Sequence, residues 1–267
     1  MKSQLNRSNL GCIIGAMRQA QRQIKVQELF AKEEFVSFED LCERFKASKS
    51  SIRRDLIELE RKGVLRRVHG GAISLQTRDE SLDFNRLSIS CHDEKVRIGK
   101  VAASLVKDGQ TVILGGGSTV AEVANNLSNR LIQIVTNSVP VAEAFWDSKQ
   151  AEVTLTGGYL YPRLGVQIGP ICEHMLDSVS ADILIMGIGG VTAAGISDSN
   201  SLNVESIRAM IRAARKVVIV ADRSKFGRDS MIHVAPLSDI DQIVSDKDLD
   251  PEFQQMLKKN DVECVLA

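Results

Sequence analysis

A glycine-rich segment near the middle of the chain has residue types that bind phosphate. The apolar run Val112–Leu114 predicts a strand, the glycines Gly115–Gly117 follow it, and Ser118 and Thr119 come next. Glycines allow backbone N–H groups to turn toward an anion, the two hydroxyls add donors, and a helix starting here would offer its positive end. The segment is neither a P-loop nor a GxGxxG dinucleotide fingerprint. A packing turn without a ligand is the alternative interpretation.

Polar and glycine residues also follow other apolar runs that predict strands, at 136–138, 156–158, 187–190 and 222–227. Ligands of open α/β sheets bind outside the carboxyl ends of the strands, so this recurrence predicts one shared cleft. Each segment taken alone is also consistent with turn chemistry. The residues predicted to bind a phosphorylated small molecule are Gly116, Gly117, Ser118, Thr119, Asn137, Gly157, Gly158, Gly187, Asp222 and Lys225.

A second group of candidates is basic and lies near the N-terminus. A helix beginning at Lys49 would turn Ile52, Leu56 and Leu59 inward and leave its basic side chains outside. Arginine pairs with guanine in the major groove, and basic residues on a following β-wing would reach the DNA backbone or minor groove. A merely solvated basic face is the alternative. The residues predicted to bind DNA are Lys49, Ser50, Ser51, Arg53, Arg54, Arg61, Arg66, Arg67 and His69.

The distribution of charge supports nucleic acid as a partner. The whole chain is neutral, but residues 1–75 carry 15 Lys/Arg and 9 Asp/Glu, whereas the remainder carries 19 and 25. A basic module attached to an acidic one is typical of a DNA-binding part joined to a part with another task.

Three short helices are expected ahead of the wing. Helical spacing begins at Arg22, Ser37 is the expected N-cap of a second helix, and Ser48 that of a third, which ends at Gly63. The sequence of residues 64–73 then predicts two short strands around Gly70-Gly71. Together these elements predict a winged helix-turn-helix.

From Glu94 onward, strands alternate with helices, which implies a mostly parallel sheet covered on both faces. The fold class is therefore α/β, with four expected segments: an extension over 1–20, the winged helix-turn-helix over 21–75, a linker or ordered arm over 76–93, and a sensing domain over 94–267. Residues 157–170 and 188–202 are expected to be glycine-rich loops. The expected strands are 111–114, 133–136, 153–156, 183–187, 217–220 and 243–245, and the expected helices are 94–107, 119–130, 139–147, 171–178 and 203–215.

Several classes of protein are excluded by absent patterns. No apolar run approaches the roughly 18 residues of a membrane span, and no signal peptide opens the printed chain, so a cytoplasmic protein is expected. The five cysteines are widely scattered and form no CxxC motif or Cys/His cluster. We therefore expect reduced thiols, no metal site and no cofactor.

Specific motifs connect these observations to a known family. Ser51–Leu56 reads S-I-R-R-D-L, and Arg67–Ala72 reads R-V-H-G-G-A. They resemble the signature of the DeoR family of sugar-metabolism repressors, in which the helix commonly reads T-I-R-R-D-L and the wing ends R-x-H-G-G-A. Later blocks are similar to the family's sensor, so the resemblance spans roughly residues 20–247. These blocks are 93–98, 135–138, 155–158, 221–227 and 234–241.

The resemblance implies a sensor related in fold to ribose-5-phosphate isomerase. It also implies that a phosphorylated sugar or polyol releases the repressor from a double-stranded DNA operator. Because one winged helix contacts few base pairs, we also expect a homo-oligomer held mainly by residues 94–267. Two positions depart from the family pattern: Gly115 stands where relatives usually have Asp, and Ile207 where they usually have Lys. Both changes remove an ionisable group, so we expect the phosphate to be bound as usual and the rest of the effector to be bound differently.

Two other functions compete with a regulated repressor. An isomerase-like enzyme with an accessory basic domain would need a positioned acid and base, for which Asp222 and Lys225 are the remaining candidates. A DNA-binding protein whose sensor has lost its ligand would also fit the sequence. The expectation from the sequence is that the protein is not an enzyme.

Overall fold

The computed structural model describes residues 19–30, 35–62, 64–68, 70–74 and 84–267. The chain divides into two compact units, Met1–Ser81 and Leu82–Ala267. Almost all of the expected extension 1–20, together with Gly63 and His69, lies outside the described residues.

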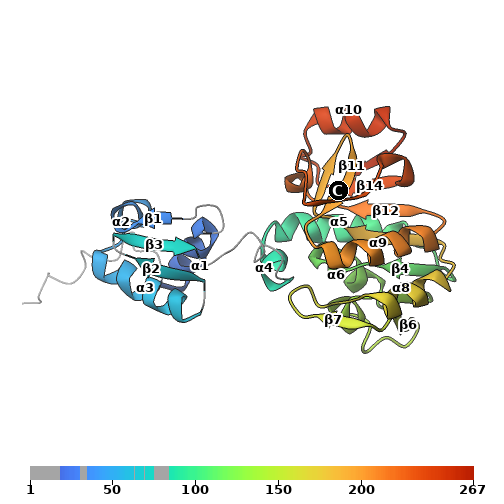
Figure 1. The fold of residues 1–267 in the computed structure, drawn as a ribbon, viewed down its shortest axis with the longest axis horizontal. Helices are drawn as coiled ribbons and strands as arrows, with labels where there is room; N and C mark the ends of the chain where they lie inside the picture. Colours follow the sequence, from blue (N-terminus) through green and yellow to red (C-terminus); the bar gives the residue numbers. More distant parts are fainter. Residues whose placement is uncertain (1–18, 31–34, 63, 69, 75–83) are drawn as a thin grey trace, which may run out of the picture. The chain divides into compact units, whose positions relative to one another are not determined.

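The first unit is a winged helix-turn-helix, coloured blue to cyan in Figure 1. The three helices and the two wing strands that the sequence predicted are confirmed. A third short strand, β1, pairs with β3 and completes an antiparallel sheet in the order β1-β3-β2. The elements are α1 (Gln19–Phe30), β1 (Phe35–Ser37), α2 (Phe38–Phe45), α3 (Lys49–Arg61), β2 (Leu65–Val68) and β3 (Gly71–Ser74).

Caps and buried residues fix the turn between α2 and α3. The hydroxyl of Ser37 accepts a hydrogen bond from the Asp40 N–H, and that of Ser48 accepts one from the Ser51 N–H, so both predicted N-caps are confirmed. Lys46 ends α2 in the left-handed conformation. The inward stripe of α3 is fully buried in a core that also includes Val26, Phe30, Leu41 and Leu65.

The second unit is built on a seven-stranded sheet in the order β15-β14-β12-β9-β4-β5-β6, with every neighbouring pair parallel. Strands follow one another outward from β4 on one side and from β9 on the other. The order of the sheet therefore reverses between β4 and β9, which is where open α/β sheets form their ligand crevice. The strands are β4 (Thr111–Leu114), β5 (Gln133–Thr136), β6 (Glu152–Leu155), β9 (Ile183–Gly187), β12 (Val217–Val220), β14 (Gln242–Ser245) and β15 (Glu263–Leu266).

Helices cover both faces of this sheet, and alternating strand residues point to two separate cores. Ile113 and Ile219 belong to the core that includes α8, α9 and α10, whereas Val112 and Val218 belong to the core that includes α5, α6 and α7. The helices are α5 (His92–Ser104), α6 (Ser118–Leu127), α7 (Val139–Glu143), α8 (Pro170–Asp177), α9 (Ser201–Ala213) and α10 (Pro251–Lys259).

Two segments that the sequence predicted as loops are hairpins. The range 157–170 contains β7 (Tyr159–Tyr161) paired with β8 (Val166–Ile168), and 188–202 contains β10 (Gly190–Thr192) paired with β11 (Gly195–Asp198). Strands of three or four residues are too short to show a clear alternation of apolar and polar residues, and their glycines are typical of loops. β11 also pairs with β13 (Ile232–Ala235), which the sequence did not predict.

Of the expected segment 76–93, residues 76–83 lie outside the described part of the chain, and most of the rest is helical. Residues 84–89 form α4 (Phe84–Ile89), and α5 begins at His92, two residues earlier than expected. Residues 84–93 therefore belong to the second unit.

Candidate functional site

The first half of α3 carries the predicted DNA-reading side chains. Lys49, Ser50, Arg53 and Arg54 are exposed, while Ser51 is half-buried and shares hydrogen bonds with the capping Ser48. Lys49 lies 3.5 Å from Glu39, a pair in which both side chains are largely exposed. Arg61 is exposed at the other end of the helix.

A buried carboxylate in the same helix, which the sequence analysis missed, orients this surface. Asp55 is 1% exposed, and its side chain accepts a hydrogen bond from Arg22 Nε at 2.5 Å. Gln23 in α1 also reaches Asp55, at 3.4 Å, and Glu58, at 2.8 Å. Because Arg53 and Arg54 directly precede Asp55, the contact with α1 fixes the rotation at which α3 presents them. The available signal was a charged residue within the apolar stripe of α3.

The wing is attached to α3 by one of its predicted DNA-binding residues. Arg67 donates from its backbone N–H and from Nε to Glu60, at 2.9 and 2.7 Å. These hydrogen bonds lower the pKa of Glu60. Arg66 is exposed on β2, and the prediction for His69 concerns a residue outside the described part of the chain.

The glycine segment lies at the switch point of the sheet. Gly117 has φ of +120° and no atom within 4 Å of where a Cβ would lie, and α6 begins at the next residue. A Cβ on Gly116 would lie 2.4 Å from Val166 in β8, so only glycine fits there. Ser118 and Thr119 are 7% and 8% exposed in the first turn of α6. The space beside Gly117 is therefore open at the N-terminus of α6, and a helix N-terminus is a favourable place for an anion.

The structure brings the segments after β4, β5, β6 and β9 together. The Asn137 side chain donates to the Gln167 carbonyl at 2.9 Å, and the Gln167 side chain accepts from the Gly157 N–H at 2.9 Å. A Cβ on Gly187 would meet the Gly116 carbonyl at 3.5 Å. Gln167, in the unpredicted strand β8, is therefore the residue that joins these loops. Gly158 follows with φ of +114°.

Asp222 and Lys225 follow β12, the strand next to β9. Asp222 is 2% exposed and accepts hydrogen bonds from the N–H and hydroxyl of Ser224. Lys225 is half-buried and attracts the carboxylate of Asp198, whose pKa is raised because it is buried. Sequence analysis missed Lys95, a 3% exposed residue of α5 that interacts electrostatically with both Asp222 and Lys225.

The two departures from the family pattern lie in apolar surroundings. A Cβ on Gly115 would lie 2.9 Å from Met186 Cβ and 3.7 Å from Met210 Sδ. Ile207 is 5% exposed and belongs to the same core as both methionines. A carboxylate at position 115 would therefore need Met186 to move.

Several buried polar atoms at this end of the sheet have no hydrogen-bond partner among the described residues. Asn137 Oδ1 is one, and Asn200 Nδ2 and Asn203 Oδ1 are two others, at the start of α9. Buried polar atoms are normally paired, so these unpaired atoms are available to a polar ligand.

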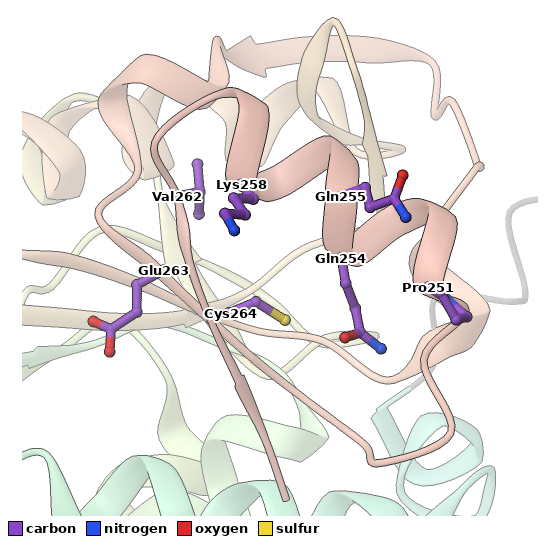
Figure 2. A pocket seen from close by; sticks show the side chains of 7 residues that line it. All are labelled: Pro251, Gln254, Gln255, Lys258, Val262, Glu263 and Cys264. Atoms are coloured by element: carbon purple, nitrogen blue, oxygen red, sulfur yellow. The ribbon is translucent and has the colours of Figure 1, made fainter.

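A separate hollow of ≈ 460 Å³ lies between α10 and β15 (Figure 2). None of the predicted site residues lines this hollow. Its lining residues are Pro251, Gln254, Gln255, Lys258, Val262, Glu263 and Cys264. No cluster of three or more metal-ligating side chains occurs within the described residues, and none of the helices described there is long and apolar enough to cross a membrane.

Each of the two structural units matches a model of a known protein family. The model of a DeoR-like helix-turn-helix domain matches residues 22–78, and the model of the DeoR C terminal sensor domain matches residues 90–247. The chain belongs to the DeoR family of transcriptional regulators. It is 29% identical over 251 residues to the transcriptional repressor GlcR of Bacillus subtilis, covering 94% of this chain and 97% of GlcR. With the glycerol-3-phosphate regulon repressor of Escherichia coli, the identity is 31% over 253 residues, covering 94% of this chain and all of the relative.

Solved structures match this DeoR-family chain only distantly. Ribose 5-phosphate isomerase A of Methanocaldococcus jannaschii is 21% identical, with a TM-score of 0.39, covering 51% of this chain and 55% of the isomerase. The sorbitol operon regulator SorC of Klebsiella pneumoniae is 13% identical, with a TM-score of 0.32, covering 77% of this chain and 89% of SorC. These distant matches assign no activity.

Proposed function

We propose that the chain is an operator-binding repressor that a phosphorylated small molecule releases from DNA. The observation that carries the proposal is the pairing, in one chain, of an α3 surface rich in exposed cations with a glycine loop at the switch point of a parallel sheet. The repressors GlcR and that of the glycerol-3-phosphate regulon, which match almost the whole chain, support the same role. The proposal includes no catalytic step.

On the DNA side, Arg53 and Arg54 are the expected readers of bases. Both side chains are exposed, and neither forms an ion pair or a hydrogen bond within the described residues. Arg53→Ala or Arg54→Ala is expected to weaken binding to the operator by about 1–3 kcal/mol and to relax specificity at one base. An operator selected from a random duplex pool supplies the probe, and fluorescence anisotropy measures the affinity.

The matched variant for this experiment is Arg66→Ala, on the wing. A side chain that contacts phosphate weakens binding to operator and random DNA alike, and its loss flattens the dependence of affinity on salt. Unchanged operator affinity for both α3 variants would remove that helix from recognition.

On the effector side, we expect the phosphate to bind the N–H groups of Gly116–Thr119, and Lys225 to add positive charge. The apolar wall at Gly115 and Ile207 leaves the remaining part of the ligand to neutral groups such as Asn137 and Asn203. We therefore propose a phosphorylated effector whose other end is bound without the two ionisable groups usual in relatives.

Gly117→Val tests the phosphate loop, because a branched side chain would block the approach of the anion. Gly109→Val is a matched control, since Gly109 also has a positive φ, of +83°, and open space around its Cβ position, but precedes β4. A thermal-shift screen of phosphorylated sugars and polyols is expected to find a stabilising ligand for the wild type and Gly109→Val only. A ligand that stabilises all three proteins equally, or one that lacks a phosphate, would contradict the assignment.

We also propose that the protein acts as a homo-oligomer held mainly by residues 94–267. One winged helix contacts few base pairs, so tight and specific binding requires two or more copies on repeated half-sites.

A further inference from the structure

The first helix of the sensor unit, α4, is held by parts of that unit that also carry proposed effector-binding residues. Its first residue, Phe84, donates its N–H to the Arg163 carbonyl at 2.8 Å, in the turn between β7 and β8. The helix packs on α6, which begins directly after Gly117. Near its other end, the Leu87 carbonyl accepts a hydrogen bond from Lys95 Nζ. All three attachments lead toward the carboxyl end of the sheet.

Lys95 links α4 to the loop after β12. Its side chain is almost fully buried, and this burial lowers the pKa of the ammonium group, while attraction to the Asp222 carboxylate opposes the shift. A buried ammonium group is costly unless it is partnered. Lys95 Nζ donates to the Leu87 carbonyl in α4, and the carboxylate of Asp222, which follows β12, attracts its charge. The ammonium therefore interacts both with α4 and with the segment that carries the proposed effector-binding residue Asp222.

The β7–β8 turn gives a second connection between α4 and the phosphate loop. Gly165 in this turn accepts a hydrogen bond from the Val139 N–H at 2.8 Å, and the neighbouring Val166 bridges to Ser138. The same Val166 occupies the space next to Gly116. A change at the phosphate loop therefore reaches Arg163, to which α4 is hydrogen-bonded, through directly packed residues.

We propose that α4 transmits the state of the effector site toward the DNA-binding unit, with the Lys95 ammonium as its movable attachment. The unit boundary falls between Ser81 and Leu82, so α4 is the first described element on the sensor side of the covalent connection. An anion bound at the site adds negative charge near Lys95, draws the ammonium away from the Leu87 carbonyl and loosens α4. This mechanism rests on the proposed function for the location of the anion, but the Lys95 connection is testable without any ligand.

Hydrogen exchange of the α4 amides in the full chain tests the connection. Lys95→Met keeps an unbranched buried side chain and removes the ammonium, so α4 is expected to exchange about tenfold faster. Asp222→Asn removes the competing charge and should slow exchange in the wild-type background, but have no effect in the Lys95→Met background. Lys100→Met, exposed on the same helix as Lys95, is the control and should change nothing.

Independent effects of Lys95→Met and Asp222→Asn on α4, or no effect of Lys95→Met, would overturn the proposal. Amides of the central strand β9 report whether each variant keeps its fold. If Lys95→Met loses its fold, Asp222→Asn alone decides, because unchanged α4 exchange in that variant contradicts a shared ammonium.

Adding millimolar inorganic phosphate separates the two proposals. Protection of the Gly116–Thr119 amides together with faster α4 exchange is the expected result, and the α4 response should vanish in Lys95→Met. Without loop protection, the phosphate site of the proposed function fails, while the ligand-free double-mutant cycle still judges the connection. A protected loop with unchanged α4 exchange in the wild type overturns the transmission mechanism.

Discussion

Asp55 stabilises the packing of α3, whereas the two arginines that precede it are the residues that we propose to contact DNA bases. The two arginines before it are exposed, whereas its carboxylate is buried against Arg22, whose side chain is 11% exposed. A buried ion pair adds little net stability compared with apolar packing, but breaking it leaves an uncompensated charge. The pair therefore fixes how α3 lies on α1 more than it adds to the free energy of unfolding.

Asp55→Ala is expected to lower the free energy of unfolding by about 3–5 kcal/mol, because it removes the buried carboxylate to which Arg22 and Gln23 of α1 both donate. Glu39→Ala is the contrast, since its pair with Lys49 is exposed and should contribute about 1 kcal/mol or less. Urea denaturation followed by circular dichroism measures both. Equal losses in the two variants would show that burial of the pair is not decisive.

At the scale of elements, sequence patterns predicted what local chemistry dictates. Ser37 and Ser48 identified two helix starts because capping requires a side-chain acceptor. The central strands were readable because both of their faces are buried, which produces continuous apolar runs. β1, β8 and β11 were missed because these short segments are extended through pairing with other strands, and their own sequences show no strand pattern. With β8 unpredicted, Gln167 was missed as the link between Asn137 and Gly157.

The sequence predicted where on the sheet the candidate site lies, but it did not predict that Lys95 is buried near Asp222. Glycines and hydroxyls after successive strands placed the cleft at the carboxyl edge, where the structure brings Gly116, Gly187 and Asn137 near one another. Burial of Lys95 next to Asp222 depends on how α5 packs against the sheet. Sequence spacing carries no record of that packing.

The attachment of the wing to α3 should depend on pH. The pKa of Glu60 is lowered from the ordinary 4.5 by hydrogen bonds from Arg67, so the folded state favours the charged carboxylate. Its contribution is present above the unfolded pKa and is lost as the pH falls through the lowered, folded pKa. In NMR titrations from pH 6 to pH 3, the Arg67 amide should shift in the acid range, and Glu60→Gln should remove that transition. An Arg67 amide that titrates identically in Glu60→Gln would disprove the attachment.

At the scale of the whole molecule, the N-terminal part and the remainder carry opposite net charges. Residues 1–75 have six more basic than acidic residues, and the remainder has six more acidic than basic residues. The excess of acidic residues in the second unit disfavours its non-specific binding to DNA, so the winged unit is expected to make the contacts with DNA phosphates. Neutrality of the full chain therefore coexists with DNA binding.

An oligomer that places two winged units on one operator must be sensitive to the spacing of the half-sites. Half-sites for such a pair are about 10–10.5 base pairs apart, or a multiple of that, because each unit must meet the same face of the duplex. Inserting 5 base pairs into the selected operator turns one half-site by about half a helical turn, and the loss of simultaneous binding should weaken affinity about a hundredfold. Inserting 10 base pairs restores the facing and should recover part of the affinity, whereas an isolated half-site should bind as weakly as the 5-base-pair insertion. Light scattering of the chain alone, at the concentration of the binding assay, should report more than one copy. A monomer in solution whose operator affinity is indifferent to both insertions would refute assembly through the sensor.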